Sequence, residues 1–295
     1  MPGTLRSGAR PLFGAALAIA LVAGAPGAHA EVPCDPTAES AFDLGAARGH
    51  NAFVCGDYVG ARDVLGSVAT AGDFRPATGF SVGEALDHGV PHTALLVGGR
   101  FVASAGSVFG DVVHRLPLAD AVAVTADVTL RDGGAFREDP TLDLDSACRD
   151  LETTSILLAQ ATPTDAAPVP WYGDVRVSVS GPGTHVVRVD AADLLPPISF
   201  HLAADDASAT LLLNVTGADA TFAMGEIQLA GALDASRVVF NFPDATAIHG
   251  SAYGFKGTLL APFATLDFTA GNIDGTVVAR DFHQDAELHV GGLFT

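Results

Sequence analysis

Gly257-Thr258-Leu259-Leu260-Ala261 recurs 18 residues later as Gly275-Thr276-Val277-Val278-Ala279. A fixed offset of this kind is typical of successive coils of a β-solenoid, in which each strand stacks on its equivalent one coil away. We therefore expect the two segments to pair in parallel and in register, with their aliphatic residues in one core. Those aliphatic residues are Leu259, Leu260, Val277 and Val278.

Glycine also precedes other short aliphatic runs, such as Gly66-Ser67-Val68-Ala69 and Gly110-Asp111-Val112-Val113. Such glycines are expected to turn the chain tightly ahead of a strand. We assign this structural role to Gly66, Gly98, Gly257 and Gly275. Bulky replacements at Gly257 or Gly275 should therefore destabilise the fold more than replacements at Gly291 or Gly292. The alternative to a solenoid is a β-sandwich whose strands open with glycine.

Residues 142–161 predict one long α-helix. Leu144, Cys148, Leu151 and Leu158 recur at spacings that place them on one helix face, and prolines at 140 and 163 mark its boundaries. The fold class expected from these features is mainly β, an irregular β-solenoid with one long flanking helix.

Residues 1–30 have the features of a secretory signal peptide. Arg6 and Arg10 precede an apolar run from Leu12 to Ala25, and Ala28-His29-Ala30 provides a small-x-small cleavage site. We expect residues 31–295 to form a single secreted domain. No other stretch approaches the roughly 18 apolar residues that a membrane span requires, so we expect no span in the mature chain.

The charge balance excludes two classes of partner. The chain has 15 Lys and Arg against 34 Asp and Glu, a net charge of −19. Nucleic-acid binding depends on clustered basic residues, and an anionic membrane surface would repel such a chain. Because 48% of the residues are hydrophobic, the chain has ample material for a folded core.

Three cysteines, Cys34, Cys55 and Cys148, permit at most one internal disulfide after export. We favour Cys34 paired with Cys148 or Cys55, because the N-terminal segment around Cys34 would otherwise be loose. The alternative is three unpaired thiols, with Cys55 and Cys148 simply buried.

Several co-linear segments resemble the choice-of-anchor A domain of secreted and surface bacterial proteins. They begin with Asn51-Ala52-Phe53-Val54-Cys55-Gly56-Asp57-Tyr58 and continue through Leu213-Asn214-Val215-Thr216-Gly217 and Phe240-Asn241-Phe242-Pro243-Asp244 to the two recurring segments. The resemblance covers about residues 40–290. It implies an ice-binding-like solenoid with the helix packed alongside, and an extracellular surface or matrix role without enzymatic activity. The final Gly291-Gly292-Leu293-Phe294-Thr295 lacks an anchor signal, so we expect secretion rather than anchoring.

Gly79-Phe80-Ser81-Val82-Gly83 matches the GxSxG nucleophile elbow, so an extracellular hydrolase using Ser81 is the alternative function. The elbow requires a buried strand before the serine and a helix after it. Pro76 and Gly79 disfavour that strand. A histidine within hydrogen-bond reach of Ser81 would support the hydrolase.

Metal binding is also considered. His88 and His92 have zinc-ligand spacing, but Gly89 and Pro91 lie between them and favour a loop. Four aspartates stand beside glycines in expected turns, where calcium could bind through oxygen ligands, although aspartate is also an ordinary turn residue. These are Asp57, Asp73, Asp111 and Asp274. We assign no catalytic, cofactor or metal residues.

A lesser alternative is ice binding. Thr258 and Thr276 would stack at the 18-residue offset, but no TxT ladder continues their row. The function that the sequence favours is non-enzymatic binding of an extracellular or cell-surface ligand, through exposed loops or a solenoid face.

Overall fold

The computed structural model describes residues 43–60, 62–124 and 127–293. The chain divides into two units, residues 1–34 and 35–295, and every described residue belongs to the second. The proposed signal peptide and Cys34 lie outside the described residues. The described strands pair in parallel from coil to coil, which confirms the solenoid; a β-sandwich would need two facing antiparallel sheets.

The strands of successive coils lie on three faces of the solenoid. The face on which the long helix lies, called here the helix face, contains β1 (His50–Val54), β4 (Ser67–Thr70), β7 (Thr93–Val97), β10 (Asp111–His114), β13 (Phe136–Glu138), β15 (Gly183–Asp190), β17 (Ala209–Thr216), β19 (Val238–Asn241) and the first residues of β21 (Thr258–Asp274) and β22 (Val277–His289).

The second face, called the β2 face, contains β2 (Tyr58–Gly60), β5 (Phe74–Pro76), β8 (Phe101–Ala103), β11 (Val122–Val124), the first half of β18 (Asp219–Gly231) and of β20 (Ala247–Lys256), and the middle of β21 and β22. The third, called the β3 face, contains β3 (Asp63–Val64), β6 (Phe80–Val82), β9 (Gly106–Phe109), β12 (Val128–Arg131), β14 (Asp174–Val179), β16 (Ser199–Ala204) and the ends of β18, β20, β21 and β22.

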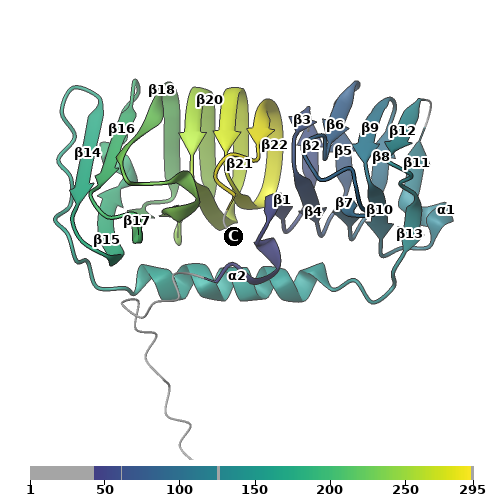
Figure 1. Ribbon diagram of the computed structural model, residues 1–295, viewed down its shortest axis with the longest axis horizontal. Coiled ribbons are helices and arrows are strands. Elements are labelled where there is room, and N and C mark those ends of the chain that lie inside the picture. The colour runs from purple at the N-terminus through teal and green to yellow at the C-terminus, as the bar shows by residue number, and fades with distance from the viewer. Residues whose placement is uncertain (1–42, 61, 125–126, 294–295) are drawn as a thin grey trace, which may run out of the picture. The chain divides into compact units, whose positions relative to one another are not determined.

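The order of coils in space differs from their order along the chain. The chain starts in the middle of the stack with β1 and winds outward to β13. Helix α2 then carries the chain back along the helix face to β14, and the later coils return toward the middle (Figure 1). The last strand, β22, pairs with both β21 and β1. The first and last coils are therefore neighbours.

Two apolar layers stabilise the stack. Leu259 pairs with Val277, and Leu260 pairs with Val278, in parallel register, which confirms the pairing expected from the recurrence. The expectation of one core is wrong, because successive side chains of a strand point to opposite sides. Leu259 and Val277 fill the solenoid interior, whereas Leu260 and Val278 pack beneath the helix.

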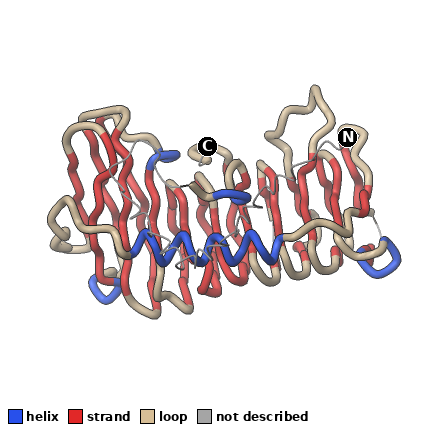
Figure 2. Tube along the Cα trace, turned by 90° about the horizontal axis from the view of Figure 1, so that it is seen from below, coloured by secondary structure: helices blue, strands red, loops and turns tan. Residues whose placement is uncertain are grey.

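The expected helix at 142–161 is present as α2 (Leu144–Ala159). The side chain of Asp143 accepts a hydrogen bond from the Ser146 N–H at 2.9 Å and caps its first turn. Its buried residues include Cys148, Leu151 and Leu158. Figure 2 shows α2 running across the strands of the helix face. The shorter helical segments are α1 (Leu118–Ala121), η1 (Gly45–Ala47), η2 (Ala191–Asp193) and η3 (Ala235–Arg237).

Candidate binding surface

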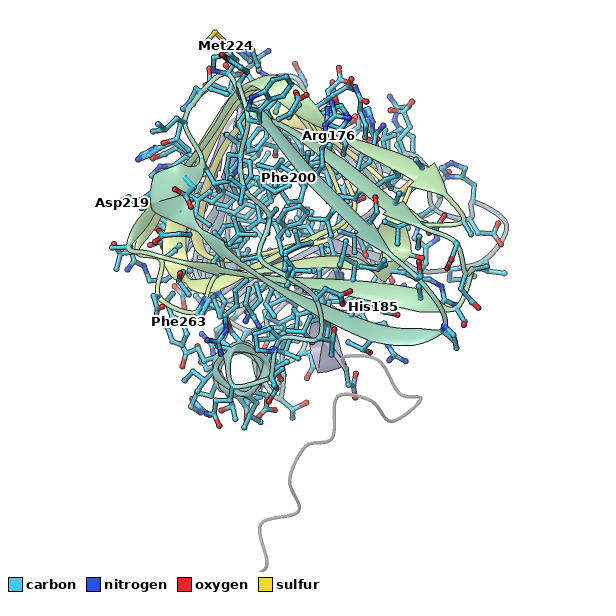
Figure 3. The ribbon with its side chains drawn as sticks, turned by 90° about the vertical axis from the view of Figure 1, so that its left-hand side faces the viewer. Arg176, His185, Phe200, Asp219, Met224 and Phe263 are labelled. Atoms are coloured by element: carbon cyan, nitrogen blue, oxygen red, sulfur yellow. A yellow bond between two sulfur atoms is a disulfide. The ribbon has the colours of Figure 1, made fainter. Side chains whose placement is uncertain are left out.

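Helix α2 leaves two faces of the solenoid open. Figure 3 looks along the stack and shows a three-sided section, with the helix beneath one side, Asp219 and Phe263 toward another, and Met224 at the apex where the β2 and β3 faces meet. Among the described elements, no long helix covers the β2 or the β3 face. Exposed side chains on the described parts of these two faces and their apex are therefore the candidates for contact with a ligand.

The helix face serves the fold itself. A disulfide joins Cys148 of α2 to Cys55, which follows β1, with 5.6 Å between their Cα atoms. Our expectation that Cys34 takes part in a disulfide with one of these residues is therefore wrong. Cys55 and Cys148 lie 93 residues apart in sequence, so only the passage of α2 over the first coil brings them together.

A buried polar network also holds α2 on the helix face. The Asn241 side chain donates to the Ser155 carbonyl at 2.9 Å and to Asn214 Oδ1 at 2.8 Å. The Ser155 hydroxyl donates to Asn241 Oδ1 at 2.6 Å, and Asn214 donates to the Leu158 carbonyl at 2.9 Å. Since these polar groups are buried and satisfied, they fix both the position and the rotation of the helix.

The β2 face carries a row of polar and charged side chains across neighbouring coils. His249 and Asp267 are register partners, and so are Asp267 and His283. Asp267 lies between the two imidazoles, 2.6 Å from His283 Nδ1 and 3.6 Å from His249 Nδ1. All three side chains are substantially exposed. The row offers charge and hydrogen-bonding groups to a polar ligand.

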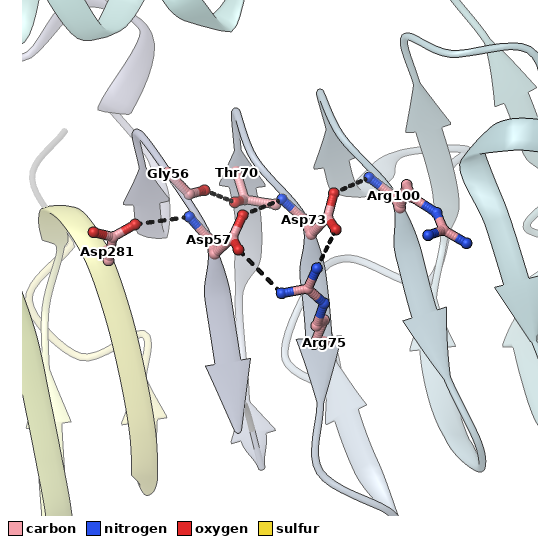
Figure 4. Close-up of polar contacts among 7 residues, drawn as sticks. All are labelled: Gly56, Asp57, Thr70, Asp73, Arg75, Arg100 and Asp281. Carbon is pink, nitrogen blue, oxygen red and sulfur yellow. Dashed lines mark hydrogen bonds and ion pairs between the residues drawn. The ribbon is translucent and has the colours of Figure 1, made fainter.

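Aspartates at the edge of the β2 face link each coil to the next (Figure 4). Asp281 accepts from the Asp57 N–H at 3.1 Å, Asp57 from the Asp73 N–H at 2.8 Å, and Asp73 from the Arg100 N–H at 2.7 Å. Arg75 forms ion pairs with both Asp57 and Asp73. These carboxylates cap backbone N–H groups, which is a structural use of the turn aspartates considered above for calcium.

The β3 face presents a row of small hydroxyl side chains. Asp63, Ser81, Ser107 and Thr129 are successive register partners on β3, β6, β9 and β12. The Ser81 hydroxyl donates to Asp63 Oδ1 at 3.0 Å. Along the N-terminal coils, this row of the β3 face therefore contains fewer charged side chains than the edge of the β2 face.

With this geometry established, comparison with known proteins identifies the family. A family model described as an ice-binding-like adhesive domain matches residues 43–290. The chain belongs to the ice-binding-like adhesive domain family. The match covers nearly all of the described residues and confirms the ice-binding-like adhesive domain that the resemblance implied.

Solved structures similar to this adhesive domain include three ice-binding proteins. That of the Antarctic ascomycete Antarctomyces psychrotrophicus is 14% identical, with a TM-score of 0.45 over 86% of this chain and 97% of the other. That of Shewanella frigidimarina is 15% identical, with a TM-score of 0.45 over 85% and 95%. An Arctic yeast protein is 16% identical, with a TM-score of 0.44 over 84% and 93%. No curated protein matches the chain.

Ser81 of the adhesive domain lacks the surroundings of a nucleophile elbow. It lies within β6 (Phe80–Val82), and the chain continues into a loop rather than a helix. Its side-chain hydrogen bond goes to Asp63, and among the described residues no histidine forms a hydrogen bond with it. The GxSxG match therefore falls on a solenoid strand.

The histidine pair lies in a loop, as the sequence suggested. His88 contacts Asp132 Oδ2 at 2.6 Å and the Glu84 carbonyl at 2.9 Å, whereas His92 contacts the Val90 and Phe109 carbonyls at 2.9 and 2.8 Å. The Asp132 carboxylate is the main cause of the raised pKa of His88. Within the described ranges, no group of three or more His, Cys, Asp or Glu could hold a metal ion.

The remaining turn aspartates also contact neighbouring groups of the adhesive domain. Asp111 accepts from the Ala135 N–H at 2.9 Å and pairs with Arg137. Asp274 accepts from Asn272 at 2.9 Å and contacts His289 Nδ1 at 2.7 Å. Partial burial opposes protonation of His289, but the Glu287 and Asp274 carboxylates together raise its pKa.

The four selected glycines lie next to strands at points of close approach. A Cβ on Gly66 would lie 2.3 Å from Asn51 Oδ1, and one on Gly98 would lie 2.4 Å from the Ala71 carbonyl oxygen. Gly257 and Gly275 have φ values of +115° and +151°. A Cβ on Gly275 would lie 2.1 Å from the Gly257 carbonyl oxygen, so the corner glycines of adjacent coils pack against each other.

The sequence reasoning missed the exposed aromatic pair Trp171 and Tyr172. Their side chains are among the most exposed large hydrophobic residues described. A signal was available, because Trp171 is the only tryptophan in the sequence and stands beside a tyrosine in a proline-containing loop. None of the described helices has the length and apolar character required to cross a membrane.

Proposed function

We propose that this chain is an exported, non-enzymatic binding protein that attaches to an extracellular or cell-surface ligand through its open solenoid faces. The observation that carries the proposal is the family match over residues 43–290. The geometry supports it, because one face is used to hold α2 while the β2 and β3 faces expose polar side chains. Residues 1–30 would direct export and then be removed, which remains part of the proposal.

A hydrolase is less well supported. General-base activation of Ser81 would need a histidine or another base within reach. Its observed partner is the Asp63 carboxylate at 3.0 Å, without the third group that orients a base in a triad.

Ice binding is the second candidate, since the family description includes it. The threonines considered for an ice-facing row do not support it, because Thr258 and Thr276 are buried on the helix face. The exposed row of the β2 face contains His249, Asp267 and His283. Water bound to these charged and polar groups is arranged differently from water in the ice lattice. We therefore place polar-ligand binding ahead of ice binding.

Variants that block one face at a time test the proposal. The labelled secreted protein would be applied to the cells that produce it, and binding would be measured by flow cytometry. Ser251→Arg with His249→Glu alters the β2 face, Arg176→Glu with His201→Glu alters the β3 face at its register partners on β14 and β16, and Asp150→Arg alters the exposed side of α2 as a control. We expect a loss of about tenfold or more for one open-face variant and none for the control.

Two results would contradict the proposal. One is wild-type protein that does not bind the cells, and the other is equal loss in all three variants. Freezing-point depression by the wild type, lost in an open-face variant, would establish ice binding instead. Fractionation of the producing cells, with and without a chelator wash, tests export and calcium-dependent retention separately.

A further inference from the structure

Large apolar side chains are exposed at the apex of the solenoid, near the end of the stack that begins with β14. Trp171, Tyr172 and Met224 have exposed fractions of 68%, 90% and 65%. Trp171 and Tyr172 are separated from the start of β14 by Gly173, and Met224 lies where β18 passes from the β2 face to the β3 face (Figure 3). We call Trp171, Tyr172 and Met224 the aromatic apex.

These side chains occupy backbone positions that repeat along the apex. Tyr172, Met224, Ala252 and Ala270 all have positive φ values between +49° and +58°. The residues flanking Met224, Ala252 and Ala270 are register partners, so these three lie side by side. The left-handed conformation is costly for residues other than glycine, and most of all for bulky ones.

The identity of the apex residue changes along the stack. The inner coils place alanine there and β18 places Met224, whereas Tyr172 adopts the same conformation ahead of β14, with the segment before β16 lying between Tyr172 and Met224. Because Tyr172 is 90% exposed, its ring contributes little burial to offset the backbone strain. The stability of the fold therefore does not explain why a large aromatic residue occupies this position, whereas recognition of a ligand does.

The aromatic pair is held in a defined position. Trp171 and Asp174 exchange two backbone hydrogen bonds of 2.9 and 3.0 Å. The ring centroids of Trp171 and Tyr172 are 4.8 Å apart at an interplanar angle of 73°. Gly173 packs so closely that a Cβ there would lie 2.3 Å from the Pro197 carbonyl oxygen. The tight turn thus presents both rings with little conformational freedom left to lose on binding.

Polar side chains of β14 and β16 begin two residues after Tyr172, on the β3 face. Asp174, which is bonded to Trp171 through the backbone, accepts from Arg176 at 2.8 Å and contacts His201 Nε2 at 3.2 Å. Arg176 and His201 are register partners on β14 and β16. The Arg176 side chain is 66% exposed, so donors and an acceptor are available beside the apolar surface.

We propose that the aromatic apex and the adjoining Asp174, Arg176 and His201 form a binding site for a neutral saccharide. The apolar C–H faces of a sugar ring pack on the rings of Trp171 and Tyr172, while its hydroxyl groups replace water at the polar cluster. This inference deepens the proposed binding function and rests on it, because it names the class of ligand.

Charge and size favour a neutral saccharide over other occupants. Asp174 is paired with Arg176 and His201, so the site has no unpaired charge to attract an ionic ligand. The net charge of −19 repels acidic polymers. A stable protein interface buries about 800 Å² on each partner. The three exposed side chains of the aromatic apex supply a smaller surface than that. A surface of this smaller size is enough for one or two sugar rings.

The single tryptophan of the sequence makes the site directly observable. The secreted full-length product would be titrated with oligosaccharides of glucose, galactose, mannose and N-acetylglucosamine while its tryptophan emission is recorded. Affinity electrophoresis in gels containing the matching polysaccharides would measure binding independently. We expect at least one neutral sugar to shift the emission and to retard migration. Trp171→Ala and Tyr172→Ala should each weaken retardation about tenfold.

Ile156→Ala is the matched control, since Ile156 is an exposed apolar residue on α2; it should bind like wild type. Absence of binding to every neutral sugar, or retardation that Trp171→Ala retains, would overturn the proposal. Binding to acidic polysaccharides alone would overturn it too. If Trp171→Ala loses cell binding while no sugar binds, the ligand is a protein and the saccharide proposal fails. If wild type does not bind cells at all, the proposed function itself fails.

Discussion

Phe53 in the first strand pairs in parallel register with Val278 in the last strand. Both side chains are buried beneath α2, together with Leu260 of the preceding coil. The two ends of the described chain are thus joined in the middle of the solenoid, at the place where the helix covers them. A change at this contact should affect both halves of the stack.

Replacement of Phe53 by alanine tests this joint. Phe53 is 1% exposed, so the truncation should lower the free energy of unfolding by about 3–5 kcal/mol, measured by urea denaturation. Leu157→Ala, on the exposed side of α2, is the control and should change it by less than about 0.5 kcal/mol. Equal effects of the two changes would show that the first and last coils are not stabilised by this packing.

Asn241→Ala should destabilise the protein by about 2–4 kcal/mol, because it leaves buried groups of Ser155 and Asn214 without hydrogen bonds. Thermal unfolding measures the loss. Asn272→Ala, which removes a more exposed hydrogen bond to Asp274, is the matched control. A melting temperature for Asn241→Ala equal to that of the control would contradict the role of the network in holding α2.

Reduction of the Cys55–Cys148 disulfide should lower stability by about 2–4 kcal/mol, since it frees a long loop in the unfolded chain. Denaturant unfolding with and without dithiothreitol measures this difference. A Cys55→Ala, Cys148→Ala double variant should not respond to the reductant. Loss of the wild-type response in Cys34→Ala, which leaves the Cys55–Cys148 bond intact, would instead point to a bond involving Cys34 and thus against the observed pairing.

Gly275→Val should destabilise the fold far more than Gly291→Val. A side chain at Gly275 would collide with the Gly257 backbone, whereas the space around Gly291 is open. Gly292 is not the mild control that the sequence suggested, because it has a φ of +103° and a Cβ there would lie 2.5 Å from Ala235 Cβ. Similar melting temperatures for the Gly275 and Gly291 variants would rule out the packed corner.

His50 should make stability depend on pH. Burial lowers its pKa from 6.5 to about 4, so the unfolded chain binds a proton between these pH values and the folded chain does not. Stability is therefore full above pH 6.5 and falls as the pH decreases toward 4. Compared with His50→Gln, the wild type should lose about 3 kcal/mol more between pH 7.5 and 4. A parallel pH dependence of the two proteins would refute this.

Surface features that depend on residues close together in the sequence could be predicted from it. Pro76 and Gly79 ahead of Ser81 indicated that the GxSxG match is not a nucleophile elbow, and Ser81 indeed lies within strand β6. The lone Trp171 beside Tyr172 could be seen in the sequence, but its place ahead of the polar residues of β14 and β16 follows only from the stacking of the coils. The same holds for Asp57 and Asp73, whose carboxylates bond to the next coil rather than to their own turn.

Two local patterns in the sequence were enough to predict the parallel solenoid and the position of α2. The 18-residue recurrence predicted the register of Leu259 with Val277, and the helical spacing of apolar residues predicted the helix. Both patterns involve residues that lie close together in the sequence. The disulfide between Cys55 and Cys148, and the packing of Leu260 and Val278 beneath α2 rather than in the interior, follow from how the coils and the helix are assembled. Those outcomes depend on the chain starting in the middle of the stack and on α2 crossing back over it, and contacts between distant segments leave no local pattern in the sequence.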